Sequence, residues 1–269
     1  MSVKTTIKRV AESVAPRLTI AVQAARARRR SHRLLKEWGL WSLDQRLIAE
    51  LGNRVLGGPF AGLTLSPLTQ AEHVGPYLLG TYEAELHDTW SRLLQREYRE
   101  IVDVGANFGY YAVGFARRCP NAKVVAFDVD PWARKTVAEM AAANGTANLS
   151  IESWCDASWL ANNLNPNSLI MSDCEGYEGA LFCEQWVPAF ASCTFVIELH
   201  EAYVPGVTEC CRAMFADTHT AQIVKTRTEM PLVARPASFT DDEMRRVSTE
   251  PRGPQQWLVL TPLPPAVRP

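Results

Sequence analysis

The chain has 269 residues, of which 47% are hydrophobic and 21% are charged, and its formal net charge is −1. This is the composition of an ordinary globular protein, and so small a net charge excludes a chain whose whole surface attracts nucleic acid. The seven cysteines show no paired C-x-x-C spacing, which argues against a disulfide framework and a structural zinc site. Since no apolar run reaches the ~20 residues needed to span a bilayer, the sequence predicts a cytoplasmic protein.

The first part of the chain is basic and lacks a strand pattern. Residues 1–40 contain ten Lys or Arg and two Glu, and helix is expected up to about residue 58, where Gly57-Gly58-Pro59 interrupts the chain. We interpret residues 1–77 as a helical extension. Its basic helix is either a solvated cap, which we favour, or a peripheral contact with an anionic membrane or partner.

From residue 78 onward, short apolar runs alternate with helical stretches. Strands are expected at Ile101–Val104, Lys123–Phe127, Leu149–Trp154, Leu169–Ser172, Thr194–Leu199, Ala221–Lys225 and Gln256–Leu260. Helices are expected at Tyr82–Arg96, Tyr110–Arg118, Trp132–Asn144 and near Gly179–Trp186, with a long polar stretch at Ser238–Gln255. The alternation predicts βαβ units. We therefore expect residues 78–269 to form an α/β domain with a doubly wound, mostly parallel, seven-stranded Rossmann-like sheet.

The turn after the first of these strands carries the strongest signal. It reads Asp103-Val104-Gly105-Ala106-Asn107-Phe108-Gly109 and opens directly into a helix. The two glycines let a ligand lie against the backbone, and the helix offers it unpaired N–H groups, as at the nucleotide site of doubly wound folds. A dinucleotide fingerprint would read G-x-G-x-x-G. Here an acid stands two residues before the first glycine instead.

The acid in this turn indicates which ligand binds there. S-adenosylmethionine carries an ammonium and a sulfonium group but no phosphate, so its site requires a carboxylate and no pyrophosphate cradle. We therefore predict S-adenosylmethionine as the cofactor, with Asp103 attracting its methionine end and Gly105, Asn107 and Gly109 lining the turn. A role for Asp103 in capping the turn is compatible with this prediction.

Three further acids are candidates for binding the same cofactor. Asp128 ends the second strand, 19 positions after Gly109, where an acid accepts both ribose hydroxyls in this class of fold. Asp130 precedes Pro131 and is expected to cap the next helix, although the two acids could exchange roles. Asp156 either accepts from the adenine amino group or is a plain turn residue, and Glu83 either reaches the cofactor or pairs with a neighbouring arginine.

At this point the chain resembles the FkbM-type family of methyltransferases. The turn with its two following tyrosines is similar to the family's first motif, and three more blocks lie in the family's order: Gly80-Thr81-Tyr82-Glu83, Ser172-Asp173-Cys174-Glu175-Gly176-Tyr177-Glu178 and Phe195-Val196-Ile197-Glu198-Leu199-His200. The resemblance covers about Gly80 to Glu201. It implies O-methylation of a hydroxyl, often on a sugar, glycolipid or polyketide. Two positions depart from the family: Asp128-Val129-Asp130-Pro131 replaces a Glu-Pro pair, and Met171 stands where a lysine is common.

Methyl transfer to an alcohol requires alignment and a base that takes the hydroxyl proton. His200 is the first candidate for this base, because the ordinary pKa of histidine, ~6.5, suits proton transfer near neutrality. Asp173 follows the fourth strand, and Glu198 lies two residues before His200 on the same side of the fifth strand. These two acids complete the predicted catalytic set. The three residues could instead hold a divalent metal, but without a ligand-dense motif we predict none.

Two other readings of the sequence remain. A nicotinamide-dependent oxidoreductase would share the glycine turn and the ribose-binding acid Asp128. It would require a third glycine at the position where Ala112 or Val113 stands in this chain. A catalytically inactive methyltransferase-fold scaffold would not need the intact acids and glycines. A nucleic-acid methyltransferase is disfavoured by the sequence pI of about 6.5, so we expect a small-molecule or glycan acceptor and no nucleic acid.

Overall fold

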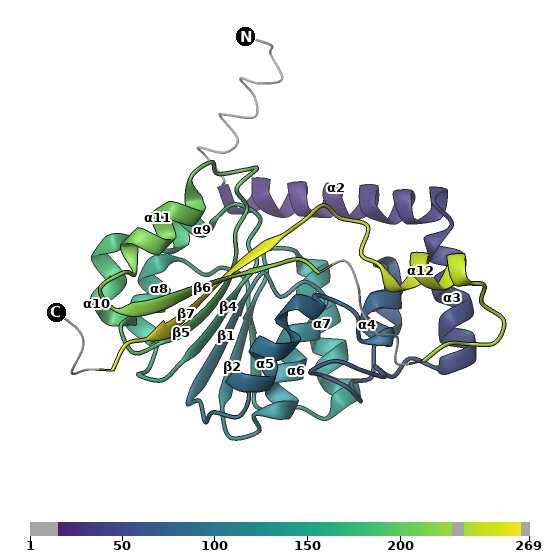
Figure 1. The fold of residues 1–269 in the computed structure, drawn as a ribbon, viewed down its shortest axis with the longest axis horizontal. Coiled ribbons are helices and arrows are strands. Elements are labelled where there is room, and N and C mark those ends of the chain that lie inside the picture. Colours follow the sequence, from purple (N-terminus) through teal and green to yellow (C-terminus); the bar gives the residue numbers. More distant parts are fainter. Residues whose placement is uncertain (1–15, 228–233, 265–269) are drawn as a thin grey trace, which may run out of the picture.

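The computed structural model describes residues 16–227 and 234–264 (Figure 1). Its centre is a seven-stranded sheet in the order β3-β2-β1-β4-β5-β7-β6. The strands are β1 (Glu100–Val104), β2 (Lys123–Phe127), β3 (Leu149–Glu152), β4 (Leu169–Ser172), β5 (Thr194–Glu198), β6 (His219–Lys225) and β7 (Gln256–Pro262). Strands β1 to β5 pair in parallel, and β7 runs antiparallel to both of its neighbours, β5 and β6. The predicted Rossmann-like α/β fold is confirmed.

Successive residues of the central strands point to opposite faces of the sheet, and both faces are buried. Along β1, Ile101 belongs to one hydrophobic cluster and Val102 to the other, and along β2 the same holds for Val124 and Val125. Burial on both faces explains why these strands are near-continuous apolar runs in the sequence.

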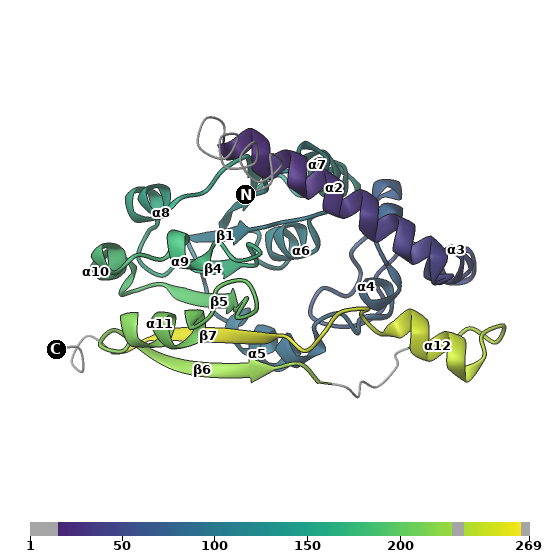
Figure 2. The same cartoon turned by 90° about the horizontal axis from the view of Figure 1, so that it is seen from above.

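Helices cover both faces of the sheet (Figure 2). The first face is covered by α5 (His87–Leu93), α6 (Tyr110–Arg118) and α7 (Pro131–Asn144). The second face is covered by α8 (Ala157–Asn163), α9 (Glu178–Leu181), α10 (Val187–Phe190) and α11 (Val207–Met214). Short 3₁₀ turns lie at Pro67–Ala71, Ala84–Leu86 and Glu184–Trp186.

The N-terminal helices do not form a separate unit, because their buried side chains join the hydrophobic cluster of the first face. They are α2 (Pro16–Glu37) and α3 (Leu40–Leu51), and Leu43 and Leu47 of α3 are buried in the same cluster as the α6 side chains. The predicted boundary between residues 77 and 78 falls inside α4 (Gly75–Leu79). The predicted helix over residues 1–15 lies outside the described residues. Helix was expected up to about residue 58, but α3 ends at Leu51 and the residues from 52 to 58 are not helical.

Two segments differ from the sequence expectation. The polar stretch 238–255 contains α12 (Asp241–Ser248), which begins at a capping box between Thr240 and Glu243. The helix expected from Tyr82 begins later, because Glu83 adopts a left-handed backbone conformation with φ of 42°. All seven cysteines are free thiols in the structure. In the part of the chain that the structure describes, every helix is too short or too polar to cross a membrane.

Candidate functional site

The strand order reverses between β1 and β4, and the carboxyl ends of these neighbours form the site where doubly wound sheets bind ligands. Asp103 lies on β1, and Asp173 follows β4 directly. The loops after the two strands touch: a Cβ on Gly105 would lie 1.7 Å from the carbonyl oxygen of Asp173. Only glycine fits there, and its φ of 90° also favours glycine.

The turn after β1 is held against the end of β2 by hydrogen bonds. The N–H groups of Gly105 and Ala106 both donate to the carbonyl of Phe127, each at 2.9 Å. Asn107, in the left-handed region with φ of 45°, donates its N–H to Oδ2 of Asp128 at 2.8 Å. The turn and the acid predicted to bind ribose are therefore in direct contact.

The two acids after β2 have different partners. Asp128 accepts the N–H of Asp130 on Oδ1 at 2.8 Å. Asp130 in turn accepts the N–H of Trp132 at 2.9 Å and caps α7, which confirms the capping role predicted for it. Burial raises the pKa of Asp128 to about 7. Asp128 is thus the acid at the strand end that does not cap the helix.

Asp103 is a buried carboxylate with an oxygen left unpaired. Its exposed fraction is 2%, and its Oδ2 has no hydrogen-bond partner among the described residues. Burial, with the nearby charges of Asp173 and Asp128, raises its pKa to about 8. An ionised carboxylate that is buried without a cation is unfavourable, which is the physical reason why the pKa of Asp103 is raised.

A cavity lies directly beside Asp103. Its volume is about 40 Å³, room for a few water-sized groups. Its walls are the turn after β1 with the ring of Phe108, the loop after β4, and four tyrosine rings from α4, the segment after it and α6: Tyr77, Tyr82, Tyr110 and Tyr111. Tyr77 and Tyr82 stack with ring centres 3.8 Å apart. The unpaired oxygen of Asp103 therefore belongs to a residue that lines a small pocket with aromatic walls.

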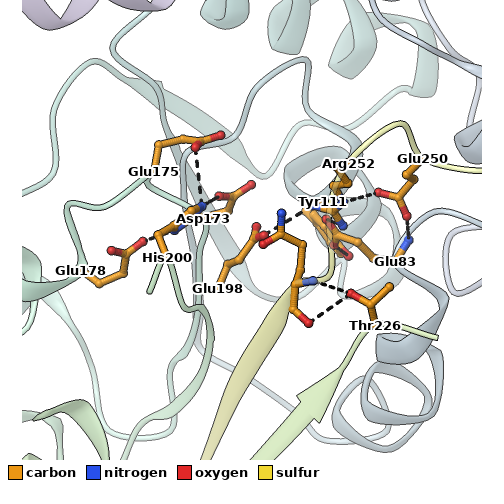
Figure 3. A network of polar contacts seen from close by, with 11 residues as sticks. Glu83, Tyr111, Asp173, Glu175, Glu178, Glu198, His200, Thr226, Glu250 and Arg252 are labelled. Carbon is orange, nitrogen blue, oxygen red and sulfur yellow. Dashed lines mark hydrogen bonds and ion pairs between the residues drawn. The ribbon is translucent and has the colours of Figure 1, made fainter. Parts of the chain in front are cut away.

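His200 follows β5 and is surrounded by carboxylates (Figure 3). Its Nδ1 lies 2.5 Å from Oε1 of Glu178, and its Nε2 lies 3.5 Å from Asp173 and 3.6 Å from Glu175. Burial lowers the pKa of His200, but the hydrogen bond to Glu178 and the charges of the three acids outweigh it and leave that pKa above its ordinary value. The ring of Tyr203, 66% exposed, lies parallel to the imidazole at 5.7 Å.

A second network on the far side of Asp173 is centred on Arg252 (Figure 3). The Arg252 guanidinium lies 3.0 Å from Glu83, 3.4 Å from Glu198 and 2.7 Å from Glu250. Burial, then the charges of Asp173 and Glu83, raises the pKa of Glu198 far above its ordinary range. Burial also raises the pKa of Glu83 to about 8. One arginine thus holds together three acids from distant parts of the chain.

The predicted residues fall into two groups. Asp103, Gly105, Asn107, Gly109, Asp128, Asp173, Glu198 and His200 come together at the carboxyl edge of β1, β2, β4 and β5. Glu83 pairs with Arg252 and accepts the hydroxyl of Tyr111, which matches the second of the two roles proposed for it. Asp156 caps α8, where its Oδ1 accepts from Trp159 at 2.9 Å and from Ser158 at 2.7 Å.

Sequence reasoning missed three members of the site. Arg252 lies in a polar stretch without periodicity, and Tyr77 lies before the first recognised motif. Glu178 belongs to the block that follows the fourth strand but was not included in the predicted catalytic set, yet it is fully buried and contacts His200. The available signal was its place in the block that begins at Ser172.

One group of residues in the described chain offers ligand atoms close enough for a metal ion. Asp173, Glu175 and His200 each place one such atom within 4.8 Å of the others. The possible metal ligands considered from the sequence were Asp173, Glu198 and His200. In the structure Glu175 takes the place of Glu198, because Glu198 pairs with Arg252.

No protein-family model and no curated protein matches this sequence. Several solved structures are similar in fold. The O-methyltransferase TomG from Streptomyces achromogenes, solved with SAM, is 16% identical, with 82% of this chain and 96% of that chain covered and a TM-score of 0.47. An rRNA methylase from Streptococcus thermophilus is 13% identical over 66% of this chain and 96% of that chain, with a TM-score of 0.46. Precorrin-6y C5,15-methyltransferase from Geobacter metallireducens is 12% identical over 65% and 89%, with a TM-score of 0.44.

Proposed function

We propose that this chain is an S-adenosylmethionine-dependent methyltransferase of the FkbM type that methylates a hydroxyl of a sugar, a glycolipid or a polyketide-type small molecule. The observation that carries the proposal is Asp103: a buried carboxylate with an unpaired oxygen beside a small cavity at the switch point of the sheet. A nucleotide with a phosphate would be repelled there. A ligand whose end group is an ammonium would supply the missing cation.

The other residues that we assign to cofactor binding lie at the same carboxyl edge of the sheet. Asp128 stands at the end of β2, one strand away from Asp103, and is the acid we assign to the ribose hydroxyls. Gly105 and Gly109 leave the backbone of the turn free of side chains, so the ligand can approach it closely. The cofactor supplies an electrophilic methyl group on a sulfonium.

His200 is the residue we assign to proton removal from the acceptor. Hydrogen bonds from His200 and from backbone N–H groups overcome burial and lower the pKa of Glu178, which therefore stays ionised. In neutral His200 the Nδ1–H donates to Glu178, which leaves the lone pair of Nε2 on the side of Asp173 and Glu175. Nε2 of His200 would take the proton of the acceptor hydroxyl while the cofactor supplied the methyl group to the acceptor oxygen. His200 would then be left protonated.

Asp173 and Glu198 frame the space between the cofactor acid and the base. Asp173 contributes to the raised pKa of Asp103 and lies 3.5 Å from Nε2 of His200. Asp173 therefore lies between Asp103 and the proposed base His200, where we propose that it orients the acceptor hydroxyl. Glu198 lies beside Asp173 and pairs with Arg252 at 3.4 Å.

Calorimetric titration tests the proposed cofactor. We expect S-adenosylmethionine and S-adenosylhomocysteine to bind at micromolar concentration, and we expect Asp103→Asn and Asp128→Asn each to weaken binding tenfold or more, because each removes a charge-assisted hydrogen bond. Asp217→Asn, at an exposed loop position, is the matched control and should bind normally. Binding of NADH alone would identify an oxidoreductase, and binding of none of the three would favour an inactive scaffold.

A further inference from the structure

Helix α2 carries an uneven distribution of charge. It contains seven Lys or Arg and a single Glu, whereas the whole chain has a net charge of −1. Five of the cations are exposed: Arg26, Arg29, Arg30, Arg33 and Lys36. We call these five residues the α2 basic face.

The spacing of the α2 basic face places its members on one side of the helix. Steps of three, four and seven residues return to the same side of an α-helix, and the five cations are related by such steps. The stretch from Arg26 to Lys36 extends about 15 Å along the axis. Val22 falls on this side too and is 42% exposed. Among them only Arg33 has an acidic partner on the helix, Glu37 at 3.6 Å.

The opposite side of α2 is anchored beside the proposed cofactor site. Arg28 pairs with Asp130 at the end of β2, and its guanidinium lies 4.4 Å from the ring centre of Trp132. Leu35, on the same side, is 2% exposed and belongs to the core. Figure 2 shows α2 running over α7, the helix that follows the carboxyl end of β2. The exposure of its five basic side chains places the α2 basic face on the solvent side of the helix.

We propose that the α2 basic face docks this protein on the surface of a bilayer that contains anionic phospholipid. Clustered Lys and Arg side chains on an exposed helix are attracted to such a surface, each strengthening binding about fivefold. The bilayer then lies against the same edge of the sheet as the proposed active site. A methyl acceptor embedded in or attached to the bilayer would reach that edge without entering bulk solvent.

The geometry favours a lipid surface over a nucleic acid. The cations follow the outer side of one straight helix, which suits a flat, anionic plane. Nucleic-acid binding sites combine basic residues with aromatic rings on which bases stack. Within the described residues the exposed large hydrophobic side chains are Val22, Trp38 and Tyr203. Trp38, and the Trp41 ring that lies 5.3 Å from Nζ of Lys36, follow the end of the helix and do not lie between the cations. With so little apolar surface on this side, docking is electrostatic and shallow.

Vesicle co-sedimentation of the full chain tests the proposal. The probes are vesicles of phosphatidylcholine alone and of phosphatidylcholine with 30% phosphatidylglycerol. We expect binding only to the second, and its loss at about 0.5 M NaCl, where the screening length is short. Arg26→Gln, Arg29→Gln and Arg33→Gln combined should weaken this binding about a hundredfold.

The matched control removes three exposed arginines elsewhere: Arg96→Gln, Arg99→Gln and Arg118→Gln combined. It lowers the net charge equally and should bind vesicles normally, and circular dichroism verifies that both variants are folded. Three results would overturn the proposal: no binding to the anionic vesicles, equal weakening by both triple variants, or tighter binding to duplex DNA at the same phosphate concentration. Because the assay needs no cofactor, its outcome is separate from that of the proposed methyl transfer.

Discussion

Replacement of Asp103 with Asn should stabilise the ligand-free protein, and more so as the pH rises. The pKa of Asp103 is raised from 3.8 to about 8. The folded protein therefore holds this proton more tightly than the unfolded chain does. The stabilisation of the folded state by this proton is complete below pH ~4 and is lost as the pH rises toward 8. Four pKa units correspond to at most about 5 kcal/mol, of which about 4 kcal/mol is lost between pH 5 and pH 8.

The assay is urea unfolding of wild type and Asp103→Asn at pH 5, 6, 7 and 8. Asparagine cannot ionise, so the difference in unfolding free energy between the two proteins should grow by about 4 kcal/mol over this range. The exposed Asp217→Asn control should show no such growth. A difference that is independent of pH, or a variant less stable than wild type at pH 8, would refute the account of Asp103 as a strained carboxylate that awaits a cation.

Three further substitutions test the geometry around the site. Gly105→Ala puts a methyl group 1.7 Å from a carbonyl oxygen, so calorimetry should find that cofactor binding is abolished. The control Gly179→Ala, which has nothing within 4 Å of the added methyl group, should bind the cofactor normally. Intact binding by Gly105→Ala would contradict the turn geometry. Arg252→Met leaves buried glutamates without their cation and should lower the unfolding free energy at pH 8 by about 3 kcal/mol or more; unchanged stability in urea would show that the network is not formed. Glu178→Gln should lower the pKa of His200, which the hydrogen bond to Glu178 raises in wild type. Equal values in both proteins by NMR titration would argue against their contact.

Much of the sheet could be predicted from sequence because its central strands are buried on both faces. The bounds of Lys123–Phe127 and Leu169–Ser172 agree with the structure, and so does the helix Tyr110–Arg118. The carboxyl ends of parallel strands meet at one edge, so Asp103 and Asp173 could be placed together before any coordinates were known.

The parts that sequence reasoning missed depend on contacts between distant residues. Arg252 donates a hydrogen bond to Glu83, which is 169 residues away in the sequence. No local sequence pattern predicts such a pair. Helix α12 was overlooked because only Met244 and Val247 of its residues are buried. The capping box at Thr240 was the signal that could have found this helix.

Local hydrogen bonding also decided the role of one predicted residue. Asp156 was assigned to adenine or to a turn, and its side chain caps α8. A carboxylate that follows a strand and precedes a helix serves either purpose, since N-caps and ligand acids occur at the same sequence position. Asp130 and Asp128 show the same ambiguity, resolved by the hydrogen bond from Trp132.

The most direct test of the central claim is a crystal structure of the protein with S-adenosylhomocysteine, which retains the ammonium of the cofactor. We predict that the ammonium donates to Oδ2 of Asp103 and that the ribose hydroxyls donate to Asp128, with the ligand backbone against Gly105. A ligand bound away from the ends of β1 and β2, or one whose ammonium leaves Asp103 unpaired, would contradict the proposed methyltransferase site.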